Sequence, residues 1–277
     1  IIEKVGPAKK IAFDESGKLT KPGMGFLQGA GASESAVFIK ETPKGEYIAV
    51  KVEIKGKNTC ELLPVIMKNC LEKTAFPKSM RWGSMDFAFA RPIRWIISLW
   101  NEEIIDFEFC GIKSGNISQG NRFSKIINEI KINSADSYLE DLKTVHVIAD
   151  REVRKRMIQD QMSEIMSASN FVIQEDLRLL DQVADLVEYP NAVVASYDAK
   201  YLRLPEKIIT STLTQNQKYF SVLDNNKNLS NYFVFISNGN PEYSEIIRIG
   251  NEKVVKARLE DAEFYYNEDS KKRLDSY

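Results

Sequence analysis

The sequence is poor in the residues that most often carry catalysis or bind metals. It contains one histidine and three cysteines among 277 residues. Cys60, Cys70 and Cys110 are widely spaced and form no C-x-x-C pair, which gives no zinc motif and fits a reducing cytosol. His146 stands in the apolar run Val-His-Val-Ile, so a structural role is favoured, and no nucleophile elbow accompanies it for Ser-His-Asp chemistry. We therefore predict no metal site and no catalytic residue in this chain.

Excess charge and long apolar runs are also lacking. The formal net charge is −1, from 38 basic and 39 acidic residues. Proteins that hold nucleic acid by bulk charge are usually much more basic, so any RNA contact must come from local patches or be shared with a partner. No signal peptide and no apolar run of membrane-spanning length is found, which predicts no membrane association. The chain starts at Ile1 without a methionine and finishes in a charged stretch, so both ends are expected to continue in a longer protein.

What the chain does contain is a regular series of hairpins and amphipathic helices. Hydrophobic residues make up 43% and charged residues 28%, a balance typical of globular proteins. Hairpins are predicted at residues 38–54 and at 219–237, and further strands at 126–132 and 145–148. Helices are predicted at 59–73 with a buried stripe, from Ser134 to Leu142, after Asp150, at 175–188, at 205–218 and from about Asn251.

The strands come as hairpins rather than as βαβ units, which predicts an α+β fold with mainly antiparallel sheets. Hairpins give way to two consecutive helices near residue 149. We therefore expect a division into residues 1–148, rich in hairpins, and residues 149–277, a second α+β region.

Arginines lie among aromatic residues in the segment 81–123. Centring a turn on Glu102 predicts three cross-strand pairs on the apolar face: Leu99 with Ile105, Ile97 with Phe107, and Trp95 with Phe109. On the polar face Arg94 would then reach Glu108, so an ion pair is favoured over a ligand contact for this arginine. Arg91 precedes Pro92, and Arg81 precedes Trp82, so both are candidates for exposed cations or for cations stacked on a ring.

Two glycine-rich segments could approach an anion. Residues 20–31 nearly spell a nucleotide fingerprint, but the spacing is wrong and no strand precedes them, so a short helix or loop is favoured over phosphate binding. The loop 113–123, KSGNISQGNRF, starts with Lys113 and ends with Arg122 and Phe123. Its glycines would let backbone amides approach a phosphate that an arginine could hold in a bidentate manner, while a tight connection between strands explains them equally well.

The densest basic patch lies at the start of the helix that follows Asp150. Arg151, Arg154, Lys155 and Arg156 form it, and such a stripe could grip phosphates. A solvated helix face is the alternative, because Glu152 and nearby acidic residues dilute the positive charge.

Several longer blocks carry a family resemblance. They are RWG at 81–83, FARPIRWIISL at 89–99, GIKSGNISQGNRF at 111–123, LVEYPNAVVASYDAKYLRLPEKIITSTLTQNQKYF at 186–220, and RIGNEKVVKARLEDAEFYYNED at 248–269. With them the chain resembles the β subunit of bacterial heterotetrameric glycyl-tRNA synthetase. One departure is Asn121, where the family often has histidine, and this weakens any acid–base role at that turn. A further similarity is to the B3/B4 module of the phenylalanyl enzyme's β chain.

The resemblance implies a cytoplasmic translation ligase built of two α and two β chains. It implies that ATP and Mg²⁺ are used through the α subunit, that this chain holds no cofactor, and that its partners are the α subunit and tRNA(Gly). The chain would be an N-terminal fragment of the β subunit. The residues independently argue against a catalytic site in this chain. A class I synthetase site needs an H-x-G-H cluster, which one histidine cannot provide. A class II site needs a Gly-rich strand ending in an ATP-binding arginine, and none is found.

The sequence thus predicts a non-catalytic part of the enzyme that binds tRNA and docks the α subunit. The alternatives are a hydrolytic editing module like B3/B4, and a purely structural interaction domain. Seven cations are the candidate RNA contacts: Arg81, Arg91, Lys113, Arg122, Arg151, Arg154 and Lys155.

Overall fold

The computed structural model describes residues 1–53, 56–123 and 129–271. It confirms an α+β protein whose sheets are mostly antiparallel. The chain forms two compact units, Ile1–Leu63 and Pro64–Tyr277, which are described separately. The expected division near residue 149 falls inside the second unit and stays a prediction. Among the described residues, no helix combines the length and the apolar character needed to cross a membrane.

The first unit is a small sheet covered by helices. Its elements are β1 (Ile2–Ala8), α1 (Lys9–Ala12), α2 (Lys21–Ala30), a 3₁₀ turn (Glu34–Ala36), β2 (Val37–Thr42) and β3 (Gly45–Val52). The antiparallel strand order is β1-β3-β2, and the predicted 38–54 hairpin is confirmed as β2–β3. Leu27 and Ala30 of α2 pack with Val50 of β3 in the core.

The glycine-rich segment 20–31 is a helix, and Gly23 explains part of its composition. A Cβ at Gly23 would lie 2.6 Å from the carbonyl oxygen of Ala12. The glycine therefore allows α2 to approach α1 closely. Gly31 ends the helix in the left-handed conformation, with φ +70°.

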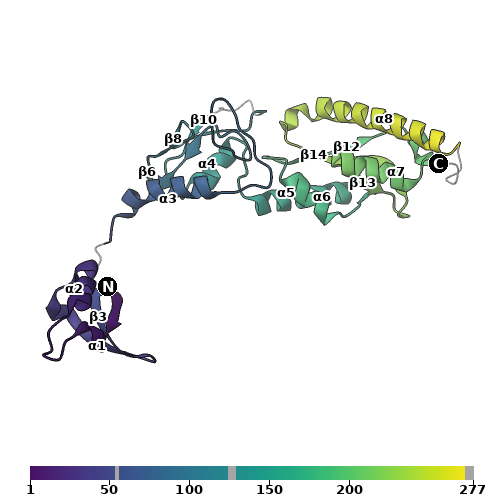
Figure 1. The fold of residues 1–277 in the computed structure, drawn as a ribbon. Coiled ribbons are helices and arrows are strands. Elements are labelled where there is room, and N and C mark those ends of the chain that lie inside the picture. The colour runs from purple at the N-terminus through teal and green to yellow at the C-terminus, as the bar shows by residue number, and fades with distance from the viewer. Residues whose placement is uncertain (54–55, 124–128, 272–277) are drawn as a thin grey trace. The chain divides into compact units, whose positions relative to one another are not determined.

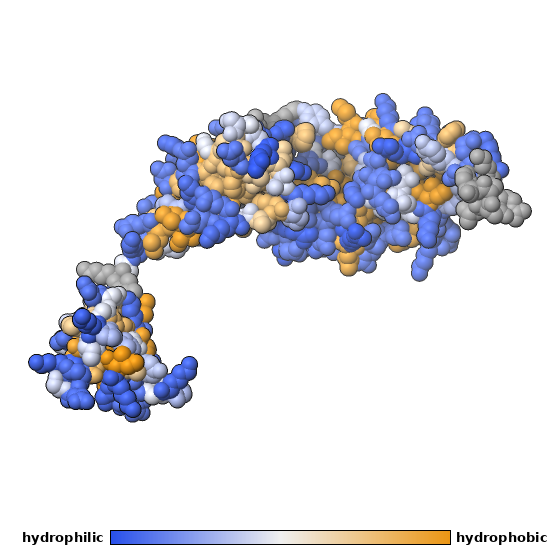
Figure 2. All heavy atoms as spheres, in the orientation of Figure 1, coloured by the Kyte–Doolittle hydropathy of each residue, from blue (hydrophilic) through white to orange (hydrophobic). Residues whose placement is uncertain are grey.

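Helix α3 (Thr59–Lys73) is confirmed, but its predicted buried stripe is wrong. None of its residues is buried, and Leu62, Val65 and Ile66 are exposed. Figure 2 shows hydrophobic surface, in orange, over α3. The boundary between the two units falls inside this helix, so its apolar stripe belongs to no single core.

Short strands build the first part of the second unit. They are β4 (Ile96–Ile97), β5 (Leu99–Trp100), β6 (Glu103–Ile104), β7 (Glu108–Phe109), β8 (Ile112–Gly115), β9 (Ile117–Gln119) and β10 (Glu129–Lys131). Strand β10 falls within the predicted 126–132 strand, of which residues 126–128 lie outside the described part. Strand β4 pairs in parallel with β8, β7 pairs antiparallel with β8, and β9 pairs with β10.

The predicted register of the 93–109 hairpin is wrong. Leu99 pairs with Ile104 across a two-residue turn, rather than with Ile105 across a turn centred on Glu102. The cause is Asn101, which adopts φ +54°, a left-handed conformation that asparagine tolerates and tight hairpins require. The pairs of Ile97 with Phe107 and of Trp95 with Phe109 are wrong too, because the chain turns again at Cys110.

The predicted burial of the second strand's apolar face is nevertheless confirmed. Ile105, Phe107 and Phe109 are all buried. Alternation along a strand therefore identified which side chains are buried, although not their partners.

The turn after α4 (Tyr138–Thr144) replaces a predicted strand at 145–148. His146 has φ +56°, and its ring lies 4.7 Å from that of Tyr189. The amide of Val147 donates to the carbonyl of Leu142, so this apolar run closes a helix instead of extending. Helix α4 also begins later than the Ser134 start that its sequence predicted.

The second part of this unit is a three-layer arrangement. An antiparallel sheet has the order β11 (Val172–Ile173), β13 (Phe220–Leu223), β14 (Leu229–Ser237) and β12 (Asn191–Ser196). Helices α5 (Arg151–Ala168) and α6 (Leu177–Ala184) lie on one face, and α7 (Glu206–Ser211) and α8 (Ser244–Asp269) on the other (Figure 1). Single-turn and π-helical segments at Ala199–Arg203, Thr212–Gln217 and Pro241–Tyr243 join them. The predicted helices and the 219–237 hairpin are thus confirmed, with α8 starting earlier than expected.

Alternating side chains of β14 fill two cores. Phe233 and Phe235 face the core that includes Val255 and Leu259 of α8. Val234 faces the opposite core, with Ile158 of α5. Asp150 caps α5 as predicted, because its side chain accepts from the amides of Glu152 and Val153.

Candidate functional site

The seven predicted RNA contacts lie in different surroundings. Arg81 and Arg91 are exposed, and each donates to a nearby backbone carbonyl, that of Asp86 at 3.2 Å and that of Ala90 at 3.1 Å. Lys113 is exposed on β8, opposite Glu108 of β7. None of these three cations lines the cleft that contains Arg122, which is described below.

Arg151 and Lys155 form an ion-pair cluster between α5 and α6. Arg151 binds Asp185 at 2.7 Å and Asp181 at 3.1 Å, and Lys155 binds Asp181 at 2.8 Å. The hydrogen bond from Lys155, together with that from Arg151, lowers the pKa of Asp181. Hydrogen bonding to Arg151 lowers the pKa of Asp185. Much of the positive charge of this patch is therefore offset by the neighbouring helix.

Arg154 is committed to the backbone. Its guanidinium donates to the carbonyls of Ile148 at 2.6 Å, Ala149 at 2.9 Å and Ala184 at 2.9 Å. These bonds tie the start of α5 to the end of α6. The three backbone hydrogen bonds thus account for the position of the Arg154 side chain.

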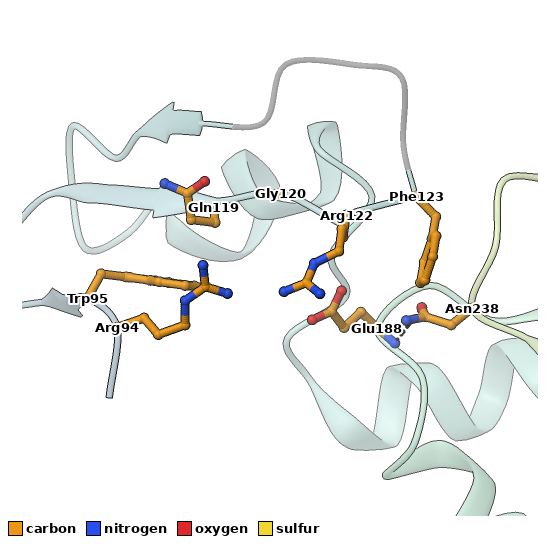
Figure 3. Close-up of a pocket in the computed structure, with 8 residues that line it drawn as sticks. All are labelled: Arg94, Trp95, Gln119, Gly120, Arg122, Phe123, Glu188 and Asn238. Carbon is orange, nitrogen blue, oxygen red and sulfur yellow. Dashed lines mark hydrogen bonds between the residues drawn. The ribbon is translucent and has the colours of Figure 1, made fainter. Parts of the chain in front are cut away.

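Arg122 has a different setting, at the rim of a cleft of about 400 Å³. Arg94 and Trp95 line the same cleft, on the segment that leads into β4. Figure 3 shows the guanidinium groups of Arg94 and Arg122 extending from two walls into one space. The structure therefore brings Arg122 together with an arginine that the sequence had assigned to Glu108.

Arg94 lies over the ring of Trp95, with its guanidinium carbon 5.9 Å from the ring centroid. This cation–π contact holds the guanidinium beside the cleft without neutralising it. The predicted cross-strand approach of Arg94 to Glu108 is wrong, because it depended on the register that Asn101 changes.

A pair of asparagines fixes the walls of the cleft. Asn121, which is 3% exposed, donates its side-chain amide to Oδ1 of Asn238 at 3.0 Å. The same oxygen accepts the backbone amides of Glu188 at 2.9 Å and Tyr189 at 3.1 Å. Oδ1 of Asn121 accepts the amide of Phe123 at 2.9 Å. These bonds join three distant segments and set the backbone on both sides of Arg122.

Two aromatic side chains remain accessible at the cleft. Trp95 is 41% exposed and Phe123 is 59% exposed. Exposed rings beside arginines are typical of surfaces that bind unpaired nucleic acid, because bases stack on them while phosphates pair with the cations.

The electrostatics of the cleft favour an anion. Two arginines and Glu188 line it, so its formal charge is two minus one, or +1. Within the described residues, no carboxylate oxygen lies within 4.0 Å of the guanidinium nitrogens of Arg94 or Arg122. These two cations are free to pair with a ligand.

The sequence missed Trp95, Glu188 and Asn238 as parts of this site. They reach the cleft from segments up to 143 residues apart, from Trp95 to Asn238, and no local pattern joins them. The available signal was the Arg-Phe pair at the end of the glycine-rich segment 113–123, which did mark one wall. The prediction of a loop there is wrong for most of the segment, because it forms β8 and β9.

A metal centre has no counterpart in the described residues. They contain no group of three or more His, Cys, Asp or Glu side chains that could hold a metal ion.

Comparisons with known proteins identify the family to which this chain belongs. All of residues 1–277 match the family of aminoacyl-tRNA synthetase chains described as glycyl-tRNA synthetase beta subunit. The chain belongs to this family.

Individual relatives support the same assignment. The chain is 42% identical over 274 residues to the glycine–tRNA ligase beta subunit of Bacillus subtilis (strain 168), covering 99% of this chain and 40% of that protein. It is 43% identical over 272 residues to that of Dictyoglomus turgidum, covering 98% and 39%. The chain therefore spans about two fifths of the length of these relatives.

Proposed function

We propose that this chain serves as a tRNA-binding and assembly part of a cytoplasmic glycine–tRNA ligase, together with an α subunit. The relatives carry the name beta subunit, and from this name we infer a partner subunit for the present chain. The substrate RNA is tRNA(Gly), and the reaction of the whole assembly is ATP-dependent glycylation.

One observation carries the tRNA assignment. Arg94 and Arg122 face one cleft, and no carboxylate of the described residues neutralises them. A chain with a net charge of −1 needs such a local site to bind a polyanion. Of the seven cations that the sequence suggested as RNA contacts, Arg122 has the strongest support. Arg94 was not among the seven, and we add it as a second RNA contact.

ATP and Mg²⁺ are assigned to the α subunit. Two observations support this proposal. A single histidine excludes the H-x-G-H cluster of a class I ATP site, and the described residues contain no group of three or more His, Cys, Asp or Glu side chains that could hold a metal ion. The chain's own contribution is to bind and orient RNA.

Salt-dependent tRNA binding tests the site. Arg94→Ala/Arg122→Ala should weaken binding and reduce the slope of log affinity against log salt by about 0.7 to 0.9 for each phosphate that the arginines no longer neutralise. Arg178→Ala is the control, because Arg178 is also exposed, lies outside the cleft and forms no ion pair among the described residues. Unchanged affinity and slope in the double variant would remove the cleft from the tRNA interface.

Reconstitution tests the assignment of catalysis. The α subunit should form glycyl-tRNA when mixed with a full-length beta subunit, and the present chain alone should form no glycyl-adenylate from glycine and ATP. Detection of that adenylate with the isolated chain would contradict the proposed division of roles.

A further inference from the structure

The cleft presents the two kinds of group that recognise an unpaired nucleotide. Arg94 and Arg122 supply cations, and Phe123 supplies a ring that is 59% exposed. We propose, resting on the tRNA-binding function above, that the cleft binds one unpaired RNA nucleotide. Its base stacks on Phe123, and its phosphate lies between the two guanidinium groups.

The size of the cleft selects a nucleotide over a helix. Its volume of about 400 Å³ lies at the lower end of the range of about 300–1,000 Å³ for small-ligand sites. An RNA duplex is recognised across a broad, shallow groove, and its bases are stacked on each other. A ring inside a small cleft can be covered only by a base that has left the stack.

The arginines define the place of the phosphate. Their guanidinium groups enter the same space (Figure 3), where two positive charges repel each other unless an anion lies between them. Arginine binds phosphate through a planar fork of N–H donors, which fixes the position of the anion as well as its charge.

Glu188 also lines the cleft and supplies a hydrogen-bond acceptor for the base. Its backbone is held by Asn238, while its side chain is exposed at the cleft. A carboxylate repels phosphate but accepts hydrogen bonds from exocyclic amino groups of bases. Cytosine, adenine and guanine carry such a group and uracil does not, so the cleft should prefer these three bases over uracil.

An acidic peptide is the competing ligand class. It would satisfy the arginines, but it would leave Phe123 uncovered and would place further negative charge against Glu188. RNA satisfies all three features, and the peptide becomes an outcome of the test.

The experiment measures affinity of the chain for short RNAs by fluorescence anisotropy. The probes are a blunt RNA hairpin, the same hairpin with three unpaired cytidines at its 3′ end, and that hairpin with three uridines instead. The cytidine probe should bind about tenfold more tightly than the blunt hairpin, since one stacked base contributes about 1–3 kcal/mol, a factor of about 5 to 150.

Phe123→Ala should remove most of that advantage. Trp100→Ala is the matched control, because Trp100 is also exposed, at 46%, but does not line the cleft. Circular dichroism of both variants should match the parent chain, since both side chains lie at the surface.

Glu188→Gln should narrow the preference for cytidine over uridine, because a side-chain amide can also donate to the uracil carbonyl. The preference in the parent chain should be about fivefold or more. Equal affinity for both tails in the parent chain would overturn the orientation of the base.

Separate results distinguish this inference from the proposed function. If Arg94→Ala/Arg122→Ala weakens tRNA binding while the blunt hairpin binds as tightly as the tailed one, the cleft contacts tRNA but takes no unpaired nucleotide. If that double variant leaves tRNA binding unchanged, the result contradicts the proposed tRNA-binding function of the cleft itself. Competition by oligo-glutamate as strong as that of an RNA of equal charge would overturn the assignment to RNA.

Discussion

Asn121 donates its side-chain amide to Asn238 across 117 residues of sequence, at 3.0 Å. Oδ1 of Asn238 accepts this bond and two backbone amides, so a single oxygen fixes the junction of three segments. Because Arg122 follows Asn121 directly and Glu188 contributes one of the amides, this oxygen also sets the width of the cleft.

Removal of the Asn238 oxygen should destabilise the chain. Asn238→Ala leaves three donors without their acceptor and should lower the free energy of unfolding by about 2–4 kcal/mol. Asn238→Asp keeps an acceptor oxygen and should lower it by less. Denaturant unfolding measures both, with the exposed Asn225→Ala as control. Equal decreases for Asn238→Ala and Asn225→Ala would show that the junction contributes nothing.

Arg154 should matter for stability rather than for RNA. Arg154→Ala leaves the carbonyls of Ile148, Ala149 and Ala184 without their donor and should lower the free energy of unfolding by about 1–3 kcal/mol. Its tRNA affinity, measured under conditions in which the chain is folded, should match that of Arg178→Ala. A selective decrease of tRNA affinity in Arg154→Ala would return this residue to the RNA interface.

The ion pair of Asp181 should add stability that disappears in acid. Its pKa in the folded chain is lowered from the usual 3.8, mainly by the hydrogen bond from Lys155. The folded state therefore favours the carboxylate, and its contribution is present above about pH 5 and is lost as the pH falls through the lowered pKa.

The difference in free energy of unfolding between the parent chain and Asp181→Asn should accordingly shrink below pH 3.8. Chemical unfolding at a series of pH values measures it, and the exposed Asp160→Asn is the control. A difference that stays constant as the pH falls would argue against a stabilising role of this pair.

Two glycines of α2 should respond in opposite ways to alanine. Gly23→Ala places a Cβ 2.6 Å from the backbone oxygen of Ala12 and should lower stability by about 1–3 kcal/mol. Gly25→Ala meets nothing within 4 Å and should raise it by up to about 1 kcal/mol, since alanine favours the helix. Thermal unfolding, followed at the transition of the first unit, compares them. The same sign for both would show that the packing against α1 relaxes freely.

Local chemistry predicted much of the fold. Asp150 identified the start of α5 because an N-cap satisfies amides only two and three residues away. The β2–β3 and β13–β14 hairpins followed from alternating side chains around polar turns. These features depend on neighbours in sequence.

The wrong predictions have one physical source. They depend on backbone conformations or tertiary contacts that the pattern of polar and apolar residues does not determine. Asn101 and His146 adopt left-handed conformations that turn the chain where an extended strand was expected. The stripe of α3 has helical spacing but no core to cover it. At the cleft, the glycine-rich segment 113–123 was enough to predict Arg122 as a binding residue. Arg94 and Glu188 come from other segments, and only the folded structure shows that they lie at the same cleft.

The junction at Asn238 has a consequence for the newly made chain. Arg94 and Arg122 emerge from the ribosome long before Asn238, which follows Arg122 by 116 residues. Until strand β14 is synthesised and folded, nothing tethers the arginine loop to the opposite wall. The nascent polypeptide thus lacks a finished cleft until the segment that contains Asn238 has been made and folded.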